Sequence, residues 1–452
     1  MRFFKPFETP ELPEFPDREV SILDFGAVGD GVTVCTAAIA AAIENIASLG
    51  GGRVVIPAGK FNTGPIHFKS NVNLHLEKGA VLEFSERFED YLPVVESVLA
   101  GVKCFSCSHL VYANRCENIA LTGEGVLNGH GRVWDWMKKH QPGMEDLMRK
   151  GQECAPLSER VYDKESDGVR PRFLQLQHCE RVLIEGVKFI NSPTWTIHPV
   201  FSKNVTVRNV TIKNPINSPN SDGINFESCK RCLLTDCYVD TGDDAVCVKA
   251  GRGRDAWSWN APCEDIEIRN ITGLSGMGSV TLGSETSASI RNVYFHDCNF
   301  GNRALGINVK TMKGRGGEIK NIDFENISVG EARRVAIKIS FRYDGEPLDD
   351  QSAPITDVPD LENISVENFS CERANAALQI EGLPGYPLKN IYLDGINIAA
   401  ANVGKLYDVE GLTMNNTSIT PLPNDGRPAP TEVGYKEMMA KLAEKEDNSL
   451  NI

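Results

Sequence analysis

Three aspartates near the middle of the chain have the residue type and spacing for acid–base chemistry. Asp222 lies in the segment Asn-Ser-Asp-Gly, and Asp243 and Asp244 lie in the segment Gly-Asp-Asp-Ala. Neighbouring carboxylates repel one another, so one keeps a proton while another stays ionised. Cleavage of a glycosidic bond needs one carboxylic acid and one carboxylate base. A purely structural role is the alternative, because Asp-Gly and Gly-Asp pairs are common in turns. Three aspartates at this spacing favour the catalytic interpretation.

A repeated segment must position these aspartates. Examples are Ser202-Lys-Asn-Val-Thr-Val-Arg-Asn-Val, Ile319-Lys-Asn-Ile-Asp-Phe-Glu-Asn-Ile and Leu388-Lys-Asn-Ile-Tyr-Leu-Asp-Gly-Ile. Alternation places Ile, Val and Leu on one face of each short strand. The Asn or Gly at each corner tolerates a left-handed backbone. The repeats are too closely spaced for a strand, a helix and a return strand at every step.

Stacked coils with continuous parallel sheets fit this repeat best. We therefore predict an all-β fold, a right-handed parallel β-helix. A β-propeller is the competing fold, but its blades need about 40–50 residues each. Stacked coils lie about 4.8 Å apart, and Asp222 and Asp243 are about one coil apart in the sequence, so we expect them to be neighbours. An open solenoid end must be covered, and the Ala-rich segment 36–49, followed by Gly50-Gly-Gly, predicts an N-terminal capping helix.

The expected organisation has three parts. Residues 1–19 form an N-terminal extension, 20–425 a single parallel β-helix catalytic domain, and 426–452 a C-terminal helix or tail, with helical pattern at 435–447. The charged segment 138–168 interrupts the repeat. We interpret it as a long insertion loop over the cleft, since long loops often carry function.

Net charge, hydropathy and cysteine spacing argue against a nucleic-acid-binding protein, a membrane-spanning protein and a cysteine-based metal site. The formal net charge of −14 disfavours nucleic acid, whose binding needs Lys and Arg to neutralise phosphates. No apolar run approaches the roughly 18 residues of a membrane span. No apolar signal region follows Met1, so we expect a cytoplasmic protein unless a signal was removed. The thirteen cysteines show no paired metal-type spacing and are expected to be buried thiols. Self-association remains open.

The motifs around the aspartates resemble those of a known family. Asn220-Ser-Asp222-Gly and Gly242-Asp243-Asp244 stand where the polygalacturonases, glycoside hydrolase family 28, have their Asn-Thr-Asp and Gly-Asp-Asp motifs. The resemblance covers roughly 20–398. Within the family the chain looks most like bacterial exo-acting galacturonosidases, through the segments Gly283-Ser-Glu285, Arg303-Ala-Leu and Ser340-Phe-Arg342-Tyr343-Asp344.

The resemblance implies a function and a mechanism. It implies an inverting glycoside hydrolase that cleaves α-glycosidic bonds in pectic poly- or oligosaccharides, with exo-action. Asp243 would protonate the glycosidic oxygen, and Asp222 and Asp244 would activate water. No cofactor and no metal would be required. The expected substrate-binding residues are Lys310, Asn308, His198, Arg342, Tyr343, Met277 and Lys249.

Two positions depart from the family pattern. The Gly-His-Gly motif falls on Gly276-Met277-Gly278, and the Arg-x-Lys motif falls on Asn308-Val309-Lys310. Arg binds a carboxylate through two hydrogen bonds, and Asn does not. The departures leave three interpretations open: a substrate other than plain polygalacturonate, such as a rhamnogalacturonan or decorated fragment; an ordinary exo-galacturonosidase that compensates through other residues, such as Arg252; or a weakened, non-catalytic β-helix that binds sugars. A calcium-dependent lyase on the same fold is a further alternative.

Overall fold

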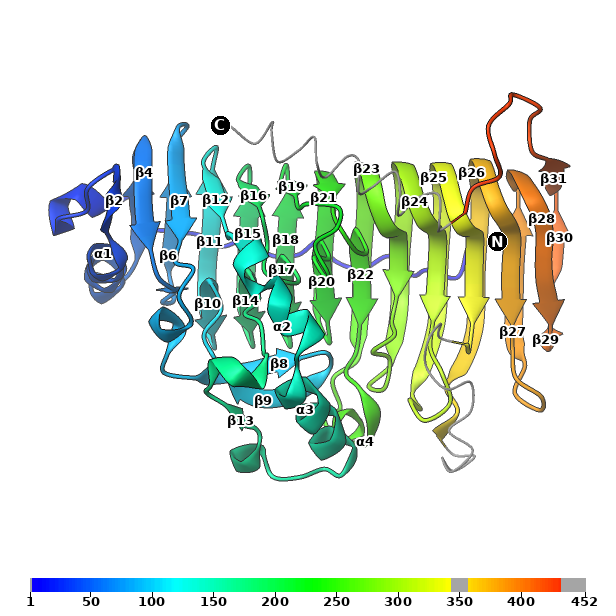
Figure 1. Cartoon of the computed structure of the whole chain (residues 1–452), viewed down its shortest axis with the longest axis horizontal. Helices are drawn as coiled ribbons and strands as arrows, with labels where there is room; N and C mark the ends of the chain where they lie inside the picture. Colours follow the sequence, from blue (N-terminus) through cyan, green and yellow to red (C-terminus); the bar gives the residue numbers. More distant parts are fainter. Residues whose placement is uncertain (1, 343–356, 432–452) are drawn as a thin grey trace. The chain divides into compact units, whose positions relative to one another are not determined.

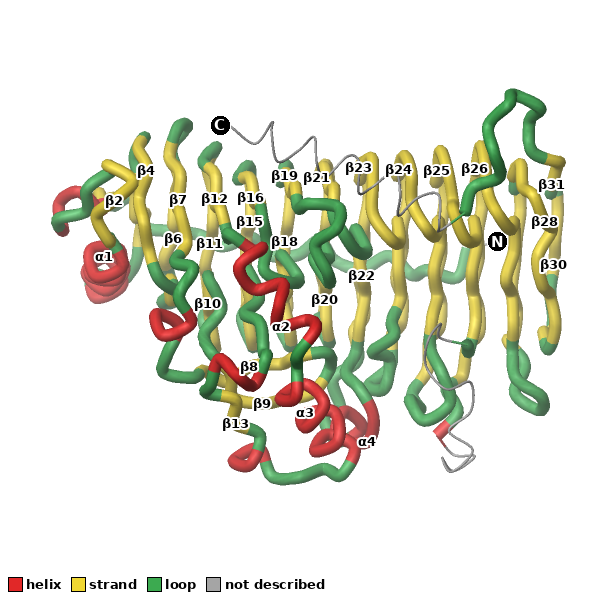
Figure 2. Tube along the Cα trace, in the orientation of Figure 1, coloured by secondary structure: helices red, strands yellow, loops and turns green. Residues whose placement is uncertain are grey.

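The computed structural model describes residues 2–342 and 357–431. The chain divides into two compact units. The N-terminal unit comprises Phe7–Asn214 and Ser218–Tyr238, and the C-terminal unit comprises Met1–Pro6, Pro215–Asn217 and Val239–Ile452. Figure 1 colours both units along the sequence, and Figure 2 shows that strands dominate them.

The N-terminal unit consists of parallel strands that pair from coil to coil in three ladders. One ladder joins β10, β14, β17 and β20; the second joins β3, β6, β11, β15, β18 and β21; the third joins β2, β4, β7, β12, β16 and β19. The strands are β1 Glu19–Ser21, β2 Asp30–Val34, β3 Gly52–Ile56, β4 Gly59–Thr63, β5 Ile66–His67, β6 Val72–Leu76, β7 Ala80–Phe84, β8 Val95–Leu99, β9 Val102–Ser106, β10 Val111–Asn114, β11 Glu117–Gly123, β12 Val126–Asn128, β13 Val161–Tyr162, β14 Leu174–Gln177, β15 Glu180–Glu185, β16 Lys188–Ile190, β17 Ile197–Val200, β18 Lys203–Arg208, β19 Thr211–Lys213, β20 Ile224–Glu227 and β21 Lys230–Asp240.

The C-terminal unit has longer strands that pair in parallel, in the order β22, β23, β24, β25, β26 and β28. Its elements are β22 Val246–Lys249, α4 Gly253–Trp257, β23 Cys263–Leu282, β24 Ile290–Lys310, β25 Glu318–Ser340, β26 Asp360–Glu381, β27 Leu388–Asp394, β28 Asn397–Tyr407, β29 Val409–Glu410, β30 Thr413–Asn415 and β31 Ser418–Pro421. Each unit is thus a stack of parallel β-helix coils, which confirms the predicted fold class.

Asparagine corners stabilise the coils as the repeat predicts. Asn321, Asn363 and Asn390 occupy equivalent corners with φ of 59°, 59° and 53°. The side-chain amide of Asn363 donates to the Asn321 oxygen at 3.0 Å, and that of Asn390 donates to the Asn363 oxygen at 3.0 Å. Asn is selected here because it accepts the left-handed backbone and bonds to the same residue on the next coil.

The Ala-rich segment forms the predicted capping helix, α1 Thr36–Ser48. Its buried face consists of small and branched apolar side chains, Ala38, Ile39, Ala42, Ile43 and Ile46. This face packs against β1 and β3 of the N-terminal unit. The helix therefore covers apolar surface that the first coil would otherwise expose to water.

The insertion at 138–168 is more ordered than the predicted loop. It contributes to α2 Asp135–Lys139 and contains α3 Pro142–Gln152 and β13. Strand β13 pairs in parallel with β9, which pairs antiparallel with β8, to make a separate three-stranded sheet. Leu147 and Tyr162 share a small core with Leu99, Val102 and Cys104. The insertion thus packs on partners from an earlier hairpin, and its predicted place over the cleft remains untested.

Other expectations have different outcomes. All cysteines are free thiols and, apart from the exposed Cys154, they are buried. None of the helices in the described part of the chain is long and apolar enough to cross a membrane. The helix expected at 435–447 and the site residue Tyr343 lie outside the described residues. The single-domain assignment of 20–425 remains a prediction.

Candidate active site

The turn that carries Asp243 and Asp244 is tied to the next coil by its backbone. It lies immediately before β22. The Met277 N–H donates to the Asp243 carbonyl at 3.0 Å, and the Ala245 N–H donates to the Gly278 carbonyl at 2.8 Å. The Asp244 N–H also donates to Asp243 Oδ1 at 2.9 Å. These bonds hold two adjacent carboxylates in fixed positions.

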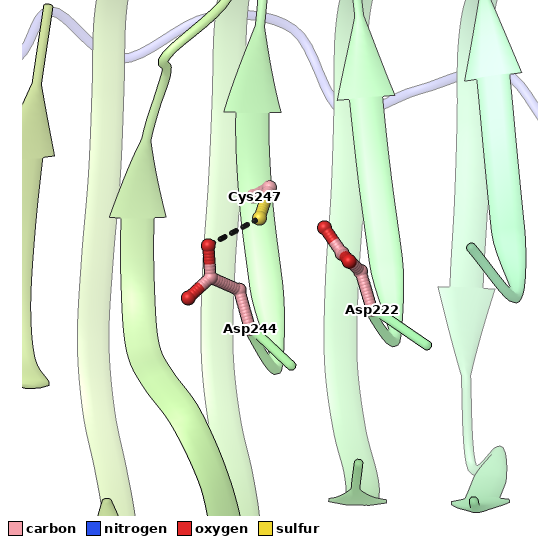
Figure 3. Close-up of side chains that lie close together, drawn as sticks. All are labelled: Asp222, Asp244 and Cys247. Atoms are coloured by element: carbon pink, nitrogen blue, oxygen red, sulfur yellow. Dashed lines mark hydrogen bonds between the residues drawn. The ribbon is translucent and has the colours of Figure 1, made fainter. Parts of the chain in front are cut away.

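Asp244 is buried beside two cationic side chains. Only 2% of the residue is exposed, and Lys310 Nζ lies 3.0 Å from Oδ2. The Cys247 thiol donates to the same oxygen at 3.6 Å (Figure 3). Burial alone would raise the pKa of Asp244, but the ammonium groups of Lys310 and Lys249 hold this pKa below its usual value. Asp244 is therefore an ionised carboxylate.

The second oxygen of Asp244 is available for chemistry. Asp244 Oδ1 is buried and has no hydrogen-bond donor among the residues that the structure describes. A buried anionic oxygen without a donor is unfavourable, and a water molecule that donates to it would remove this cost. An ionised carboxylate with one free oxygen suits a general base.

Asp243 has the opposite protonation preference. Burial, followed by the negative charge of Asp244, raises the pKa of Asp243 above its usual value. The environment thus separates two adjacent carboxyl groups into a proton donor and a proton acceptor. Opposite shifts of this kind identify acid and base partners in many hydrolases.

Glycine residues of the neighbouring coil make room for this arrangement. A Cβ atom at Gly278 would lie 2.3 Å from Asp244 Oδ1. One at Gly276, where φ is +149°, would lie 2.1 Å from Nη1 of Arg303. Between them, Met277 packs against Ala304 and nearby apolar side chains. The two glycines are therefore required by close packing, whereas the Met277 side chain makes a hydrophobic contact, and its predicted contact with substrate remains untested.

Lys249 forms a closed ion pair at the far end of β22. Its Nζ lies 2.9 Å from Glu285 Oε2 and 3.1 Å from the Gly283 carbonyl. Val246 and Val248 face the core, so Cys247 and Lys249 share the opposite face of the strand. Lys249 therefore acts on the aspartates by charge at a distance. Its predicted contact with substrate remains untested.

Asn308, predicted from the resemblance to stand in place of the motif arginine, is almost completely buried, with 1% exposed. Its neighbours in the parallel register are Thr281 and Lys338. Neither polar atom of its side chain has a hydrogen-bond partner among the described residues. Unsatisfied buried amides are rare, which marks this position as one that a ligand or water completes.

Asp222 and His198 belong to the N-terminal unit. Asp222 lies in the turn before β20 (Figure 3), is 4% exposed, and its carbonyl accepts from the Thr196 N–H at 2.8 Å. His198 is fully buried, with Nε2 2.8 Å from Glu227 Oε2 and Nδ1 3.0 Å from Gln175 Nε2. Both ring nitrogens of His198 are thus occupied by protein partners, and its predicted contact with substrate remains untested.

Arg342 is the last described residue before the gap in the description. Its backbone N–H donates to Ser340 Oγ at 2.9 Å, and its guanidinium lies 5.6 Å from the centre of the Tyr407 ring. This geometry is a cation–π contact. The side chain is therefore placed by β28, and its predicted role in substrate binding remains a prediction.

Two buried arginines near the Asp243 turn were missed by sequence reasoning. Arg303 Nη2 donates to the Val239 carbonyl at 2.8 Å, and Arg333 Nη2 donates to the Gly276 carbonyl at 2.9 Å. Their exposures are 0% and 2%. Charged residues are rarely this buried unless they are paired, so the two guanidinium groups support the backbone around the aspartates. Arg303 appeared in a family-like segment, but its structural role had no local signal.

Parallel β-helix coils that hold a carboxylic acid beside a carboxylate have the groups that cleavage of a glycosidic bond needs. The family model for glycosyl hydrolases family 28 matches residues 50–418. The chain therefore belongs to glycoside hydrolase family 28, and it is an enzyme that hydrolyses glycosidic bonds.

Individual relatives agree with this assignment. The chain is similar to the solved structure of a hyperthermoactive exopolygalacturonase from Thermotoga maritima, with 37% identity, a TM-score of 0.85, and coverage of 91% of this chain and 94% of that chain. It is 29% identical to a probable polygalacturonase from Vitis vinifera over 89% of this chain and 79% of that protein. It is 27% identical to an exo-poly-α-D-galacturonosidase from Dickeya chrysanthemi over 72% of this chain and 57% of that protein. These relatives are enzymes, so the alternative of a non-catalytic β-helix gains no support.

Proposed function

We propose that this chain is an exo-acting, inverting hydrolase of α-linked pectic oligosaccharides, either galacturonan or rhamnogalacturonan fragments. The observation that carries the proposal is the pair of adjacent carboxyl groups, with the Asp244 N–H bonded to Asp243 Oδ1 at 2.9 Å and Lys310 Nζ 3.0 Å from Asp244 Oδ2, so that the pKa of Asp243 is raised and that of Asp244 is lowered. Exo-action is supported by the relatives named above as exopolygalacturonase and exo-galacturonosidase.

The reaction follows from the protonation states. Protonated Asp243 donates its proton to the glycosidic oxygen as the bond to the anomeric carbon breaks. Water attacks the anomeric carbon from the opposite face and loses a proton to Asp244, whose Oδ1 is free among the described residues. Asp222 is proposed to share this water, because its spacing in the sequence and its family motif match the role. A direct attack by water inverts the configuration.

Substrate choice is proposed to depend on the Asn308 position. Lys310, which lies 3.0 Å from Asp244, supplies a cation close to the reacting sugar. Asn308 offers one donor group and one acceptor where an arginine would offer several donors to a carboxylate. An amide suits hydroxyl groups better than a uronate carboxylate. We therefore favour a rhamnogalacturonan or decorated fragment over plain polygalacturonate.

Chromatography of the products from a panel of pectic oligosaccharides tests the substrate and the mode of cleavage together. We expect release of a single small product from one chain end, with a rhamnogalacturonan or decorated fragment preferred. The Asp243→Asn variant is expected to release product about 10²–10⁴-fold more slowly from every substrate. The control is Asp360→Asn, which removes an exposed carboxylate in an ion pair with Lys389 and should leave product release unchanged.

Two outcomes would contradict the proposal. Equal inertness of the unaltered protein and Asp243→Asn on all substrates would exclude hydrolysis of pectic sugars. Unsaturated products that absorb ultraviolet light, with activity abolished by a chelator, would indicate a calcium-dependent lyase instead.

A further inference from the structure

A pocket of about 510 Å³ lies in the C-terminal unit beside α4, away from the Asp243 turn. The residues that define this Trp257 pocket are Trp257, Asn260, Glu264, Ser289, Arg291 and Asp357. Figure 1 shows α4 following the end of β22. In the sequence, Asp244 precedes the start of that strand. At about 3.3 Å per residue, β22 alone separates the two places by roughly 13 Å.

The aromatic wall of the pocket is exposed but held in position. Trp257 is 39% exposed, and its indole N–H donates to the Arg315 carbonyl at 2.8 Å. The Gly316 backbone passes close to the ring, since a Cβ atom there would lie 3.0 Å from the indole nitrogen. A fixed, exposed indole face is a ready surface for the C–H face of a sugar ring.

Fixed polar groups surround this ring. Glu264 Oε2 lies 4.0 Å from Arg291 Nη1, and Arg291 also bonds to the Glu318 carboxylate. On another side, Asp357 is 4% exposed and its Oδ2 lies 3.9 Å from Arg254 Nη2. The pocket thus combines one aromatic platform with two lining carboxylates and one lining guanidinium, and these groups can bond to hydroxyls.

The charges of the pocket select against acidic ligands. Glu264 and Asp357 are carboxylates in its wall, and the one cation among the described lining residues, Arg291, already lies between two glutamates. A uronate carboxylate would meet like charge without a free cation to offset it. A neutral sugar carries no charge to be repelled, and its hydroxyl groups can donate to the carboxylates and accept from Arg291.

We propose that the Trp257 pocket is an accessory binding site for a neutral saccharide, separate from the reaction centre. Its ligand class is a pentose or hexose oligosaccharide without carboxylate groups, with one ring stacked on Trp257. On a branched polysaccharide, such a site would hold a neutral side chain while the acidic main chain is cleaved elsewhere.

Isothermal titration calorimetry on the full chain tests the proposal. The protein carries Asp243→Asn in every sample, so that no ligand is consumed. The ligands are neutral galacto-, arabino- and xylo-oligosaccharides, with an oligogalacturonate of equal length as the acidic comparison. We expect at least one neutral ligand to bind to the Trp257 pocket at least ten times more tightly than the oligogalacturonate does. Oligogalacturonate binding that persists in Trp257→Ala is subtracted first. Trp257→Ala should weaken that binding by at least tenfold, and Trp257→Phe, which keeps a ring, by only a few-fold.

Trp136→Ala is the matched control, because Trp136 is another exposed tryptophan, at 43%, in the N-terminal unit. It should leave neutral-sugar binding unchanged. Thermal unfolding followed by circular dichroism establishes that each variant is folded, and Trp257→Phe is compared if Trp257→Ala is not. Absence of neutral-sugar binding, retention of binding in folded Trp257→Ala, or an equal loss in Trp136→Ala would each overturn the proposal.

Discussion

The two ends of β22 place buried charges in contrasting ways. At the far end, Lys249 and Glu285 form a closed pair, in which Lys249 also donates to a carbonyl. Burial opposes ionisation of Glu285, but Lys249 and neighbouring arginines hold the pKa of Glu285 far below its usual value. One cation and one anion satisfy each other, so this end is inert.

At the near end, two carboxyl groups compete for one cation. Asp243 and Asp244 share the cation Lys310, and one oxygen of Asp244 is left without a donor among the described residues. Burial, followed by the negative charge of Asp244, raises the pKa of Asp243 and keeps its proton on. The reactive turn therefore differs from the structural ion pair at the other end of β22 in having two carboxyl groups for one cation.

The largest expected effect is loss of the acid at the near end. Asp243→Asn removes the proton donor, so kcat should fall by about 10²–10⁴-fold, which is the usual contribution of general acid–base catalysis. Because Asp243 is protonated, the change replaces one neutral side chain by another of similar shape, so we expect thermal stability to be retained. Steady-state kinetics and a thermal melt measure the two effects. A loss of activity that merely parallels unfolding would contradict the assigned role.

Breaking the closed pair should affect stability first. Glu285→Gln leaves the Lys249 ammonium buried without its anion, and such changes cost about 3–5 kcal/mol. The free energy of unfolding in urea should fall accordingly. The double variant Lys249→Met, Glu285→Leu should recover much of the loss, because it leaves no unpaired charge. If the single variant is as stable as the unaltered protein, the pair is not a structural one.

Crowding the near end should have an intermediate effect. Gly278→Ala adds a methyl group whose ideal position lies 2.3 Å from Asp244 Oδ1. The carboxylate must move, and kcat should fall by about 10–100-fold, since misplacement by about 1 Å can cost two orders of magnitude. Gly330→Ala is the matched control, because its nearest neighbour would lie at 3.3 Å. Equal kinetics for the two variants would show that the Asp244 position is not critical.

Sequence reasoning predicted what depends on local pattern. Alternating Val and Ile, Asn corners such as Asn363, and an Ala-rich helix each have a local physical cause, so the coils and the cap were predictable. The aspartates of the near end were recognised because they are adjacent in the chain and match a family motif.

The rest depends on contacts between residues far apart in the sequence. Lys310 reaches Asp244 across 66 positions, and Arg303 reaches Val239 across 64. A charged residue in an alternating strand looks exposed until the register of the coils is known. The folded insertion was missed for the same reason, because Leu147 packs with Leu99 and Val102 from an earlier hairpin.

The smallest effect concerns pH, and it tests the electrostatic basis of the comparison. Activity requires Asp244 ionised and Asp243 protonated. The pKa of Asp244 is lowered and that of Asp243 is raised, so activity should be highest between the two values. It should fall below the Asp244 pKa, where the base is protonated, and above the Asp243 pKa, where the acid is ionised. The same shifts affect stability. Because the pKa of Asp244 is lowered by folding, ionised Asp244 stabilises the fold above its unfolded-state pKa, and this stabilisation is lost as the pH falls. Because the pKa of Asp243 is raised by folding, ionisation of Asp243 destabilises the fold as the pH rises.

Lys310→Met removes the ammonium that lies 3.0 Å from Asp244. Without that charge the pKa of Asp244 should rise, and the acidic limb of the kcat profile should move to higher pH by about one unit or more. Lys389→Met, which removes an exposed ion pair with Asp360, should leave the limb in place. Profiles of kcat against pH for the unaltered protein and the two variants test whether Lys310 sets the pKa of Asp244. Loss of a simple substrate contact would instead raise KM without moving the acidic limb. An unmoved acidic limb in Lys310→Met would mean that the cation does not set the protonation of the base, and that the near end of β22 differs from the far end in geometry alone.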